Sequence, residues 1–275
     1  MESFVFGDDK KIFSPCSKYK SPLEGGDHPE LDQSEFLDAT GTQKYQSLIG
    51  SIQWAVSLGR LDVATAVMTL SGFRSVPRQG HLERAKRVVG YLSGMKHAVI
   101  CYRTDLPDYS DLPYICNDWE RSVYGGVKEL MPNNAPKALG APVILTHYVD
   151  ANLYHDMITG RSVTDIIHFI NQTPIDFFSK KQPTCETATY GSEFVAARIC
   201  FEQIIDLCIM LRFLGATIIG HSHIFGENES VVNNSTKHTS KLHKCHNALS
   251  FHRVRESIAA GIVQFNFLPG KYNPA

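Results

Sequence analysis

Three acidic residues stand where secondary structure would fix their side chains, and together they could bind metal ions. Asp150 ends the apolar run of one expected strand, Glu193 lies in the first turns of an expected long helix, and Glu227 closes a further strand, "HSHIFGE". Three carboxylates in contact repel one another, and hard divalent cations such as Mg²⁺ relieve that repulsion through oxygen ligands. If the two strands are neighbours, the sequence indicates a metal site made by Asp150, Glu193 and Glu227.

Each of these carboxylates also has a purely structural explanation. An Asp at a strand end is commonly a turn residue or a cap, which would account for Asp150. Glu193 could interact favourably with the helix macrodipole, and Glu227 could be solvated beside Glu229. Spacing alone leaves both explanations open.

The expected elements of residues 142–275 place the three carboxylates on a mixed sheet. Three strand-like segments come first, rich in β-branched and aromatic residues: "PVILTHYVDA", "SVTDIIHFI" and "TPIDFFSKK". A long helix from 188 to 215, the strand "HSHIFGE", a helix from 241 to 261 and the strand "IVQFNFLPG" follow. The order βββ-α-β-α-β predicts an α/β (mixed α+β) domain, with a sheet of about five strands that begins as an antiparallel meander and is covered by helices.

The first half of the chain has a different organisation. Residues 1–42 are predicted to form a loop-like leader, because 14–42 are dense in Pro, Gly, Ser and Asp. Residues 43–103 show apolar residues at helical spacing in three segments, with Asp62 as a possible cap of the second, which indicates a small helical subdomain. The proline-rich residues 104–141 are predicted to be a linker.

Composition describes an ordinary globular protein. The 275 residues are 43% hydrophobic and 20% charged, and the net charge of −1 argues neither for nor against a nucleic-acid partner. The seven cysteines form no C-x-x-C pair, which favours a reducing compartment. No signal-peptide pattern or membrane span is recognised, so we expect an intracellular protein, cytoplasmic or nuclear, with no membrane partner.

The joint order of several motifs resembles a known family. These motifs are "YVDAN" (148–152), "GRSVTD" (160–165), "PIDFFSKKQPT" (174–184), "TATYGSEFVA" (187–196), "GENESVV" (226–232), "FHRVRE" (251–256) and the final "NPA". They resemble the ribonuclease H domain of copia-type retrotransposon polyproteins. The helical segments, from "YQSLIGSIQWAVSLGR" to "RAKRVVGYLSG", similarly resemble the C-terminal end of the reverse transcriptase that precedes that domain.

The resemblance implies a ribonuclease H-like fold and hydrolysis of the RNA strand of an RNA–DNA hybrid. The family's catalytic positions fall on Asp150, Glu193 and Glu227, which would bind two Mg²⁺ or Mn²⁺ ions. One ion would activate the attacking water and the other would stabilise the leaving oxygen. The implied partners are the hybrid and the remainder of a retroelement polyprotein.

Two departures from the family pattern favour an impaired enzyme. Glu227 stands where the family has Asp, and an extra methylene shifts a metal ligand by about an ångström, enough to cost ~10²-fold in rate. The family's fourth carboxylate follows "NPA", whereas the printed sequence ends at Ala275, so the domain is expected to lack its last residues. The alternative is a catalytically silent nucleic-acid-binding or assembly fragment of the polyprotein. Polymerase activity is not expected, because the adjacent pair Asp8 and Asp9 lies too near the N-terminus to belong to a polymerase palm.

Basic residues suggest where nucleic acid could bind. Lys180 and Lys181 follow the third strand, and a second set shares one stripe of the last predicted helix: Lys241, Lys244, His252 and Arg255. The ordinary solvent face of an amphipathic helix explains this stripe equally well. The neighbouring histidines and Cys245 lack zinc-motif spacing, and His246 or His252 could instead assist product release.

Overall fold

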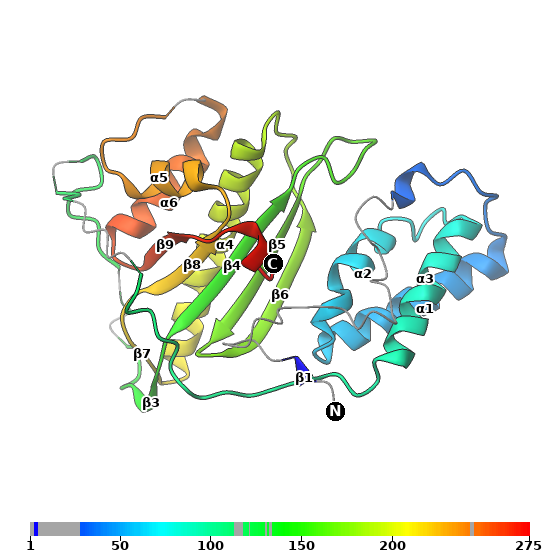
Figure 1. Ribbon diagram of the computed structural model, residues 1–275, viewed down its shortest axis with the longest axis horizontal. Coiled ribbons are helices and arrows are strands. Elements are labelled where there is room, and N and C mark those ends of the chain that lie inside the picture. The colour runs from blue at the N-terminus through cyan, green and yellow to red at the C-terminus, as the bar shows by residue number, and fades with distance from the viewer. Residues whose placement is uncertain are drawn as a thin grey trace.

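Strands of the second half of the chain form a twisted sheet, and the helices of the first half lie beside it (Figure 1). The structure is a computed structural model that describes residues 3–4, 28–112, 118–120, 122–129, 131, 134–242 and 245–275. Most of the predicted leader, including Asp8 and Asp9, therefore lies outside the described residues. Among the helices that are described, none is long and apolar enough to cross a membrane.

Three helices make up the first unit: α1 (Ala39–Ser57), α2 (Ala64–Ser71) and α3 (Gln79–Gly94). Short 3₁₀ turns precede α1 (η1, Pro29–Leu31) and α2 (η2, Leu61–Val63). Asp38 caps α1 by accepting a hydrogen bond from Gly41 N at 2.7 Å. The apolar faces of the helices bury a separate core, in which the Tyr45 hydroxyl donates to Leu70 O at 2.6 Å. The three predicted helices are therefore present.

The sheet of the second unit has the predicted meander and the predicted number of strands. Its five strands are β4 (Leu145–Asn152), β5 (Val163–Ile170), β6 (Thr173–Lys181), β8 (Ser222–Gly226) and β9 (Val263–Phe267). They are ordered β6-β5-β4-β8-β9. Pairing is antiparallel from β6 to β4 and parallel from β4 to β9. This order makes it a mixed α/β domain with the ribonuclease H-like arrangement that the resemblance implies.

Helices α4 (Thr189–Phe213), α5 (Glu229–Thr236) and α6 (Ala248–Ala259) bury one side of this sheet. Alternate residues of β4, such as Leu145 and Val149, enter a core that also contains Phe194 and Phe201 of α4. The intervening residues of β4 face the opposite side, where the Tyr109 hydroxyl lies 2.7 Å from the Thr146 hydroxyl. There, α2 contacts β6 (Figure 1), and the Thr65 hydroxyl of α2 donates to Asp165 Oδ1 of β5 at 3.4 Å.

Two short pairings join segments outside the main sheet. β3 (Leu139–Val143) runs parallel to β7 (Ala216–Ile218), directly after α4. β1 (Ser3–Phe4) runs parallel to β2 (Val99–Ile100).

Several predicted boundaries differ from the structure. α1 begins at Ala39, inside the predicted leader, because Asp38 supplies its cap, and β3 begins inside the predicted linker. Asp62 does not cap α2; its carboxylate instead forms an ion pair with Arg60 at 2.7 Å. The last helix covers only Ala248–Ala259, so residue 241 lies outside it. Helix α5, which follows an Asn228 cap, was not predicted.

Candidate active site

Asp150, Glu193 and Glu227 meet at one end of the sheet. Because β4 and β8 are parallel and Val149 pairs with Gly226, the residues that follow that pair, Asp150 and Glu227, lie at the same edge. Helix α4 packs against β4 and brings Glu193 to the same place. Each residue offers a carboxylate oxygen, and these oxygens all lie within 4.8 Å of one another. We call these residues the acidic triad.

Burial and the charges of neighbouring carboxylates raise the pKa of two members of the acidic triad. Burial, followed by the charges of Asp150 and Glu227, raises the pKa of Glu193 to about 9. Burial and the nearby charge of Glu227 raise the pKa of Asp150 to about 7. Asp150 Oδ1 is buried and has no hydrogen-bond partner in the described structure. Either protons or a bound cation must therefore compensate these groups.

The positions of Asp150 and Glu193 do not agree with the purely structural explanations, a turn residue and a favourable interaction with the helix macrodipole, whereas the acidic triad is suited to bind a hard divalent cation. Asp150 lies within β4 rather than in a turn, and the first turn of α4 contains no acidic residue, so Glu193 is not placed for the macrodipole. Clustered carboxylate oxygens, one of them buried without a partner, are the donor set that Mg²⁺ or Mn²⁺ prefers. Asp150, Glu193 and Glu227 are the residues that would hold it.

Gly270 makes room for the long side chain of Glu227. A Cβ atom built on Gly270 would overlap Glu227 Oε2, so any larger residue would displace that carboxylate. Nearby, the Asn273 amide donates to Val149 O at 2.9 Å and fixes the C-terminal segment against the strand that carries Asp150. The Glu at position 227 is therefore accommodated by the segment that crosses its strand end.

We expect Gly270→Ala to weaken divalent-cation binding and to lower any metal-dependent cleavage by about 10²-fold, because misplacing a ligand by about an ångström costs this much. The variant should fold, since Gly270 does not need a positive φ. Calorimetric titration with Mn²⁺ measures the change. Gly90→Ala is the matched control, because a Cβ there meets no atom within 4 Å. Equal affinity for Mn²⁺ in both variants would contradict this placement of Glu227.

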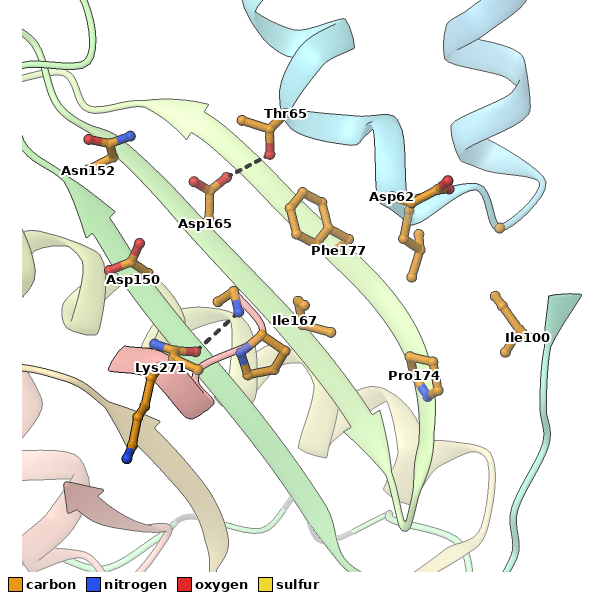
Figure 2. A pocket seen from close by; sticks show the side chains of 15 residues that line it. Asp62, Thr65, Ile100, Asp150, Asn152, Asp165, Ile167, Pro174, Phe177 and Lys271 are labelled. Carbon is orange, nitrogen blue, oxygen red and sulfur yellow. Dashed lines mark hydrogen bonds between the residues drawn. The ribbon is translucent and has the colours of Figure 1, made fainter. Parts of the chain in front are cut away.

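Sequence reasoning did not identify Asp165 as a neighbour of the acidic triad. It is the direct cross-strand partner of Asp150, is only 8% exposed, and its pKa is raised by burial. Directly paired residues of neighbouring strands point to the same face, so both carboxylates face the helical unit (Figure 2). An Asp inside the apolar run "SVTDIIHFI" was the available signal.

The predicted basic contacts are not brought together. Lys180 is exposed, whereas Lys181 Nζ binds Asp156 Oδ2 at 2.7 Å. Lys241 is exposed but precedes the last helix, and Lys244 lies outside the described residues. His252 is exposed on α6, with its Nδ1 at 2.6 Å from the hydroxyl oxygen of Tyr124. A continuous basic stripe on the last helix is therefore not present among the described residues.

Arg255 is the clear correction to the predicted nucleic-acid contacts. It is 2% exposed, and its guanidinium lies over the rings of Trp119, Tyr124 and Phe251. The same group donates to the backbone carbonyls of residues 234, 237 and 238 at 2.7–2.8 Å. Arg255 thus fixes the chain that follows α5 and has no surface to offer a phosphate.

We expect Arg255→Met to lower the free energy of unfolding by about 3 kcal/mol or more. Hydrogen bonds from a charged donor contribute about 1.5–3 kcal/mol each, and their loss would leave three carbonyls without this donor. Urea denaturation measures the loss. Arg253→Met, which removes a partly exposed ion pair on the same helix, should cost less than about 1 kcal/mol. Equal losses for the two variants would rule out this role of Arg255.

The histidines do not form a zinc site in the described part of the chain. The acidic triad is the only group there with three or more potential ligands close together. His246 Nε2 instead lies 3.1 Å from Glu186 Oε2, a carboxylate that is 5% exposed. His243 lies outside the described residues.

Sequence comparison relates the chain to transposon Pol polyproteins. It is 22% identical over 240 residues to the retrovirus-related Pol polyprotein from transposon RE1 of Arabidopsis thaliana, covering 86% of this chain and 14% of that protein. It is 22% identical over 231 residues to the corresponding polyprotein from transposon TNT 1-94 of Nicotiana tabacum, covering 84% and 15%. A transposon Ty5-1 protein of Saccharomyces cerevisiae is 38% identical over 60 residues, covering 22% and 20%. No protein-family model matches the chain.

The homologues over most of the chain are therefore retrovirus-related Pol polyproteins, which confirms the predicted resemblance to a retrotransposon polyprotein. The chain spans about 15% of the length of these relatives.

Among solved structures, similarity is found to LC11-RNase H1, isolated from compost by a metagenomic approach, with 12% identity, a TM-score of 0.37, and coverage of 47% of this chain and 87% of that one. The foamy viral protease-reverse transcriptase in complex with RNA/DNA hybrid is 13% identical, with a TM-score of 0.32 and coverage of 67% and 24%.

Proposed function

We propose that this chain is a retroelement ribonuclease H that hydrolyses the RNA strand of RNA–DNA hybrids with the help of divalent cations. The observation that carries the proposal is the convergence of the acidic triad, with oxygens within 4.8 Å and a buried Asp150 oxygen that lacks a partner. Its support from outside the structure is the similarity to transposon Pol polyproteins over most of the chain. The proposed setting is intracellular, as part of such a polyprotein.

In this proposal the three residues of the acidic triad bind the cations and differ in their exposure. When bound, two Mg²⁺ ions would activate a water molecule and stabilise the leaving oxygen of the RNA phosphate. Glu193 is buried on α4 and the half-buried Asp150 lies on β4, and these two elements pack against each other, so the two carboxylates are positioned before substrate arrives. Glu227 is exposed, so a phosphate could reach a cation bound at its carboxylate. Without a cation, the pKa of about 9 keeps Glu193 protonated near neutral pH, and the pKa of about 7 leaves Asp150 only partly ionised there.

Recognition of the duplex part of the hybrid would rest on its shape and its 2′-hydroxyl groups. Lys180, Lys241 and His252 are the exposed basic or titratable residues that remain from the predicted set. Each phosphate neutralised by such a side chain makes binding more dependent on salt. Binding that weakens as salt rises would support their role.

The test is cleavage of end-labelled RNA–DNA hybrid by the purified chain, with Mg²⁺ and with a chelator. The proposal expects cleavage of the RNA strand only, only with the cation, and no cleavage of matching DNA or RNA duplexes. If neither the chain nor its Glu227→Asp variant cleaves, but a gel shift shows preference for the hybrid, the silent binding alternative holds instead. No preference for the hybrid would reject both functions.

A further inference from the structure

A cavity of about 500 Å³ lies between the helical unit and the sheet, directly beside the acidic triad. Leu61 and Thr65 border it on the helical side, and Asp165, Ile167 and Phe177 border it on the sheet. Figure 2 shows Asp150, Asp165 and Phe177 on neighbouring strands β4, β5 and β6, on the face that meets α2. Asp150 lines the cavity as well, so the cavity and the acidic triad share a residue.

The walls of the cavity differ in chemistry. Ile100, Ile167, Pro174 and Phe177 give it an apolar side with one aromatic ring. Asp165 supplies a polar group on the sheet between that side and Asp150 (Figure 2). A volume in the range of roughly 300–1,000 Å³, apolar walls and a few placed polar groups are typical of small-ligand sites.

Of the carboxylates that line the cavity beside its apolar wall, Asp165 is the one that could accept a hydrogen bond from a ligand. Asp62 also lines the cavity, but Arg60 binds both of its oxygens, at 3.0 and 2.7 Å. The Thr65 hydroxyl donates to Asp165 Oδ1 over a long 3.4 Å, and Ser179, the cross-strand partner of Asp165, also favours its ionised form. A carboxyl group has two oxygens with two lone pairs each, so it can accept a further hydrogen bond from a ligand. A carboxyl oxygen beside an aromatic ring suits a planar ligand that carries amino groups.

We propose that this cavity holds one nucleotide, with its base against Phe177, an exocyclic amino group of the base at Asp165, and its phosphate toward Asp150. Only the placement of the phosphate rests on the proposed function, because it needs the cation-binding acidic triad. Base binding needs only the cavity walls. Both units of the chain would then contribute to one substrate site, with Thr65 and Leu61 covering the base from the helical side.

Adenosine 5′-monophosphate is the probe, titrated into the full-length chain in metal-free buffer and followed by calorimetry and ligand-observed NMR. We expect adenosine to bind at least as tightly as adenosine 5′-monophosphate, because without a cation the phosphate would be repelled by the acidic triad, and we expect ribose 5-phosphate not to bind. Loss of a base–aromatic contact, by Phe177→Ala, should raise the Kd by roughly 5- to 140-fold. Phe213→Ala, at an exposed phenylalanine of α4 outside the cavity, is the matched control and should leave the Kd unchanged.

A second variant keeps the test decisive if Phe177→Ala fails to fold. Wild type should bind adenosine more tightly than purine riboside, which lacks the exocyclic amino group, and Asp165→Val should abolish that difference. Absence of adenosine binding, ribose 5-phosphate binding as tight as that of the nucleotide, or an adenosine preference that survives Asp165→Val would each overturn the inference.

The proposed function is tested separately by Glu193→Gln. Glu193 does not line the cavity, so this variant should still bind adenosine while losing the effect of Mg²⁺ on the affinity for the nucleotide. Adenosine binding without any such Mg²⁺ effect in wild type would reject the ribonuclease proposal and keep the base pocket. An effect of Mg²⁺ on nucleotide affinity without any binding of adenosine would reject the base pocket and keep the ribonuclease proposal.

Discussion

Asp150→Asn is expected to lower Mg²⁺-dependent cleavage of an RNA–DNA hybrid by on the order of 10³-fold or more. The amide keeps the shape of the side chain but removes the charge that would attract a cation, and metal stabilisation of a phosphoryl transition state amounts to several kcal/mol. Single-turnover cleavage of a labelled hybrid measures the loss. The effect should fall on the cleavage rate rather than on hybrid binding, because Asp150 would act through the bound cation and is not a basic residue that could contact phosphates directly.

Asp176→Asn is the matched control for this variant. Asp176 is exposed on β6, and the same change there should leave the cleavage rate unaltered. The Asp150 variant should also be at least as resistant to urea as the wild type in metal-free buffer, since it removes a charge that the neighbouring carboxylates repel and that has one buried oxygen without a hydrogen-bond partner. Equal cleavage by Asp150→Asn and wild type would reject the ribonuclease proposal.

Glu193→Gln is expected to stabilise the metal-free chain at alkaline pH by a few kcal/mol. An unfolded Glu loses its proton near its ordinary pKa of 4.5, whereas burial and the neighbouring carboxylates raise the pKa of Glu193 to about 9 in the fold. Between these values the folded state binds more protons than the unfolded state, so the free energy of unfolding falls as pH rises. Asp150 adds a fall of the same sign between the ordinary Asp pKa of 3.8 and its raised pKa of about 7.

Urea denaturation at a series of pH values measures this effect. The wild type should lose stability from about pH 5 to about pH 9, and Glu193→Gln should lose less over that range. A divalent cation should reverse the wild-type loss, because it binds the ionised carboxylates; at about 100 times its Kd it would add about 2.7 kcal/mol. Glu202→Gln, on the same helix but in a partly exposed ion pair, is the control. Identical pH curves for wild type and Glu193→Gln would show that Glu193 is not held neutral.

The sheet could be predicted from the sequence because its strands carry local signals. β4, β5 and β6 are rich in β-branched and aromatic residues and are separated by turn residues, so the meander follows from the chain itself. Helix α5 was not predicted because it is short, with eight residues, and its sequence "ESVVNNST" is polar. Its helical conformation is stabilised by packing against α6 and β9 rather than by helix propensity.

Only the part of the candidate site that depends on the order of strands and helices could be predicted from the sequence. The three residues of the acidic triad were found in this way, because the motifs place two of them at strand ends and one early in a helix. Asp165 was missed because its pairing with Asp150 depends on register, which the β4–β5 connection sets with Tyr154 and Gly160 at positive φ. Arg255 was misassigned because Trp119 and Tyr124, which cover it, come from a segment predicted to be a linker. Helical spacing cannot reveal such distant contacts.

The central claim is that Asp150, Glu193 and Glu227 bind a divalent cation together, and Mn²⁺ binding followed by loss of the free-ion EPR signal tests it most directly. The account expects saturable binding by the wild-type chain near neutral pH. It expects binding to be strongly weakened by Asp150→Asn, Glu193→Gln or Glu227→Gln and to be unchanged by Asp176→Asn. Mn²⁺ binding that is equally tight in all of these variants, or absent from the wild type, would contradict it.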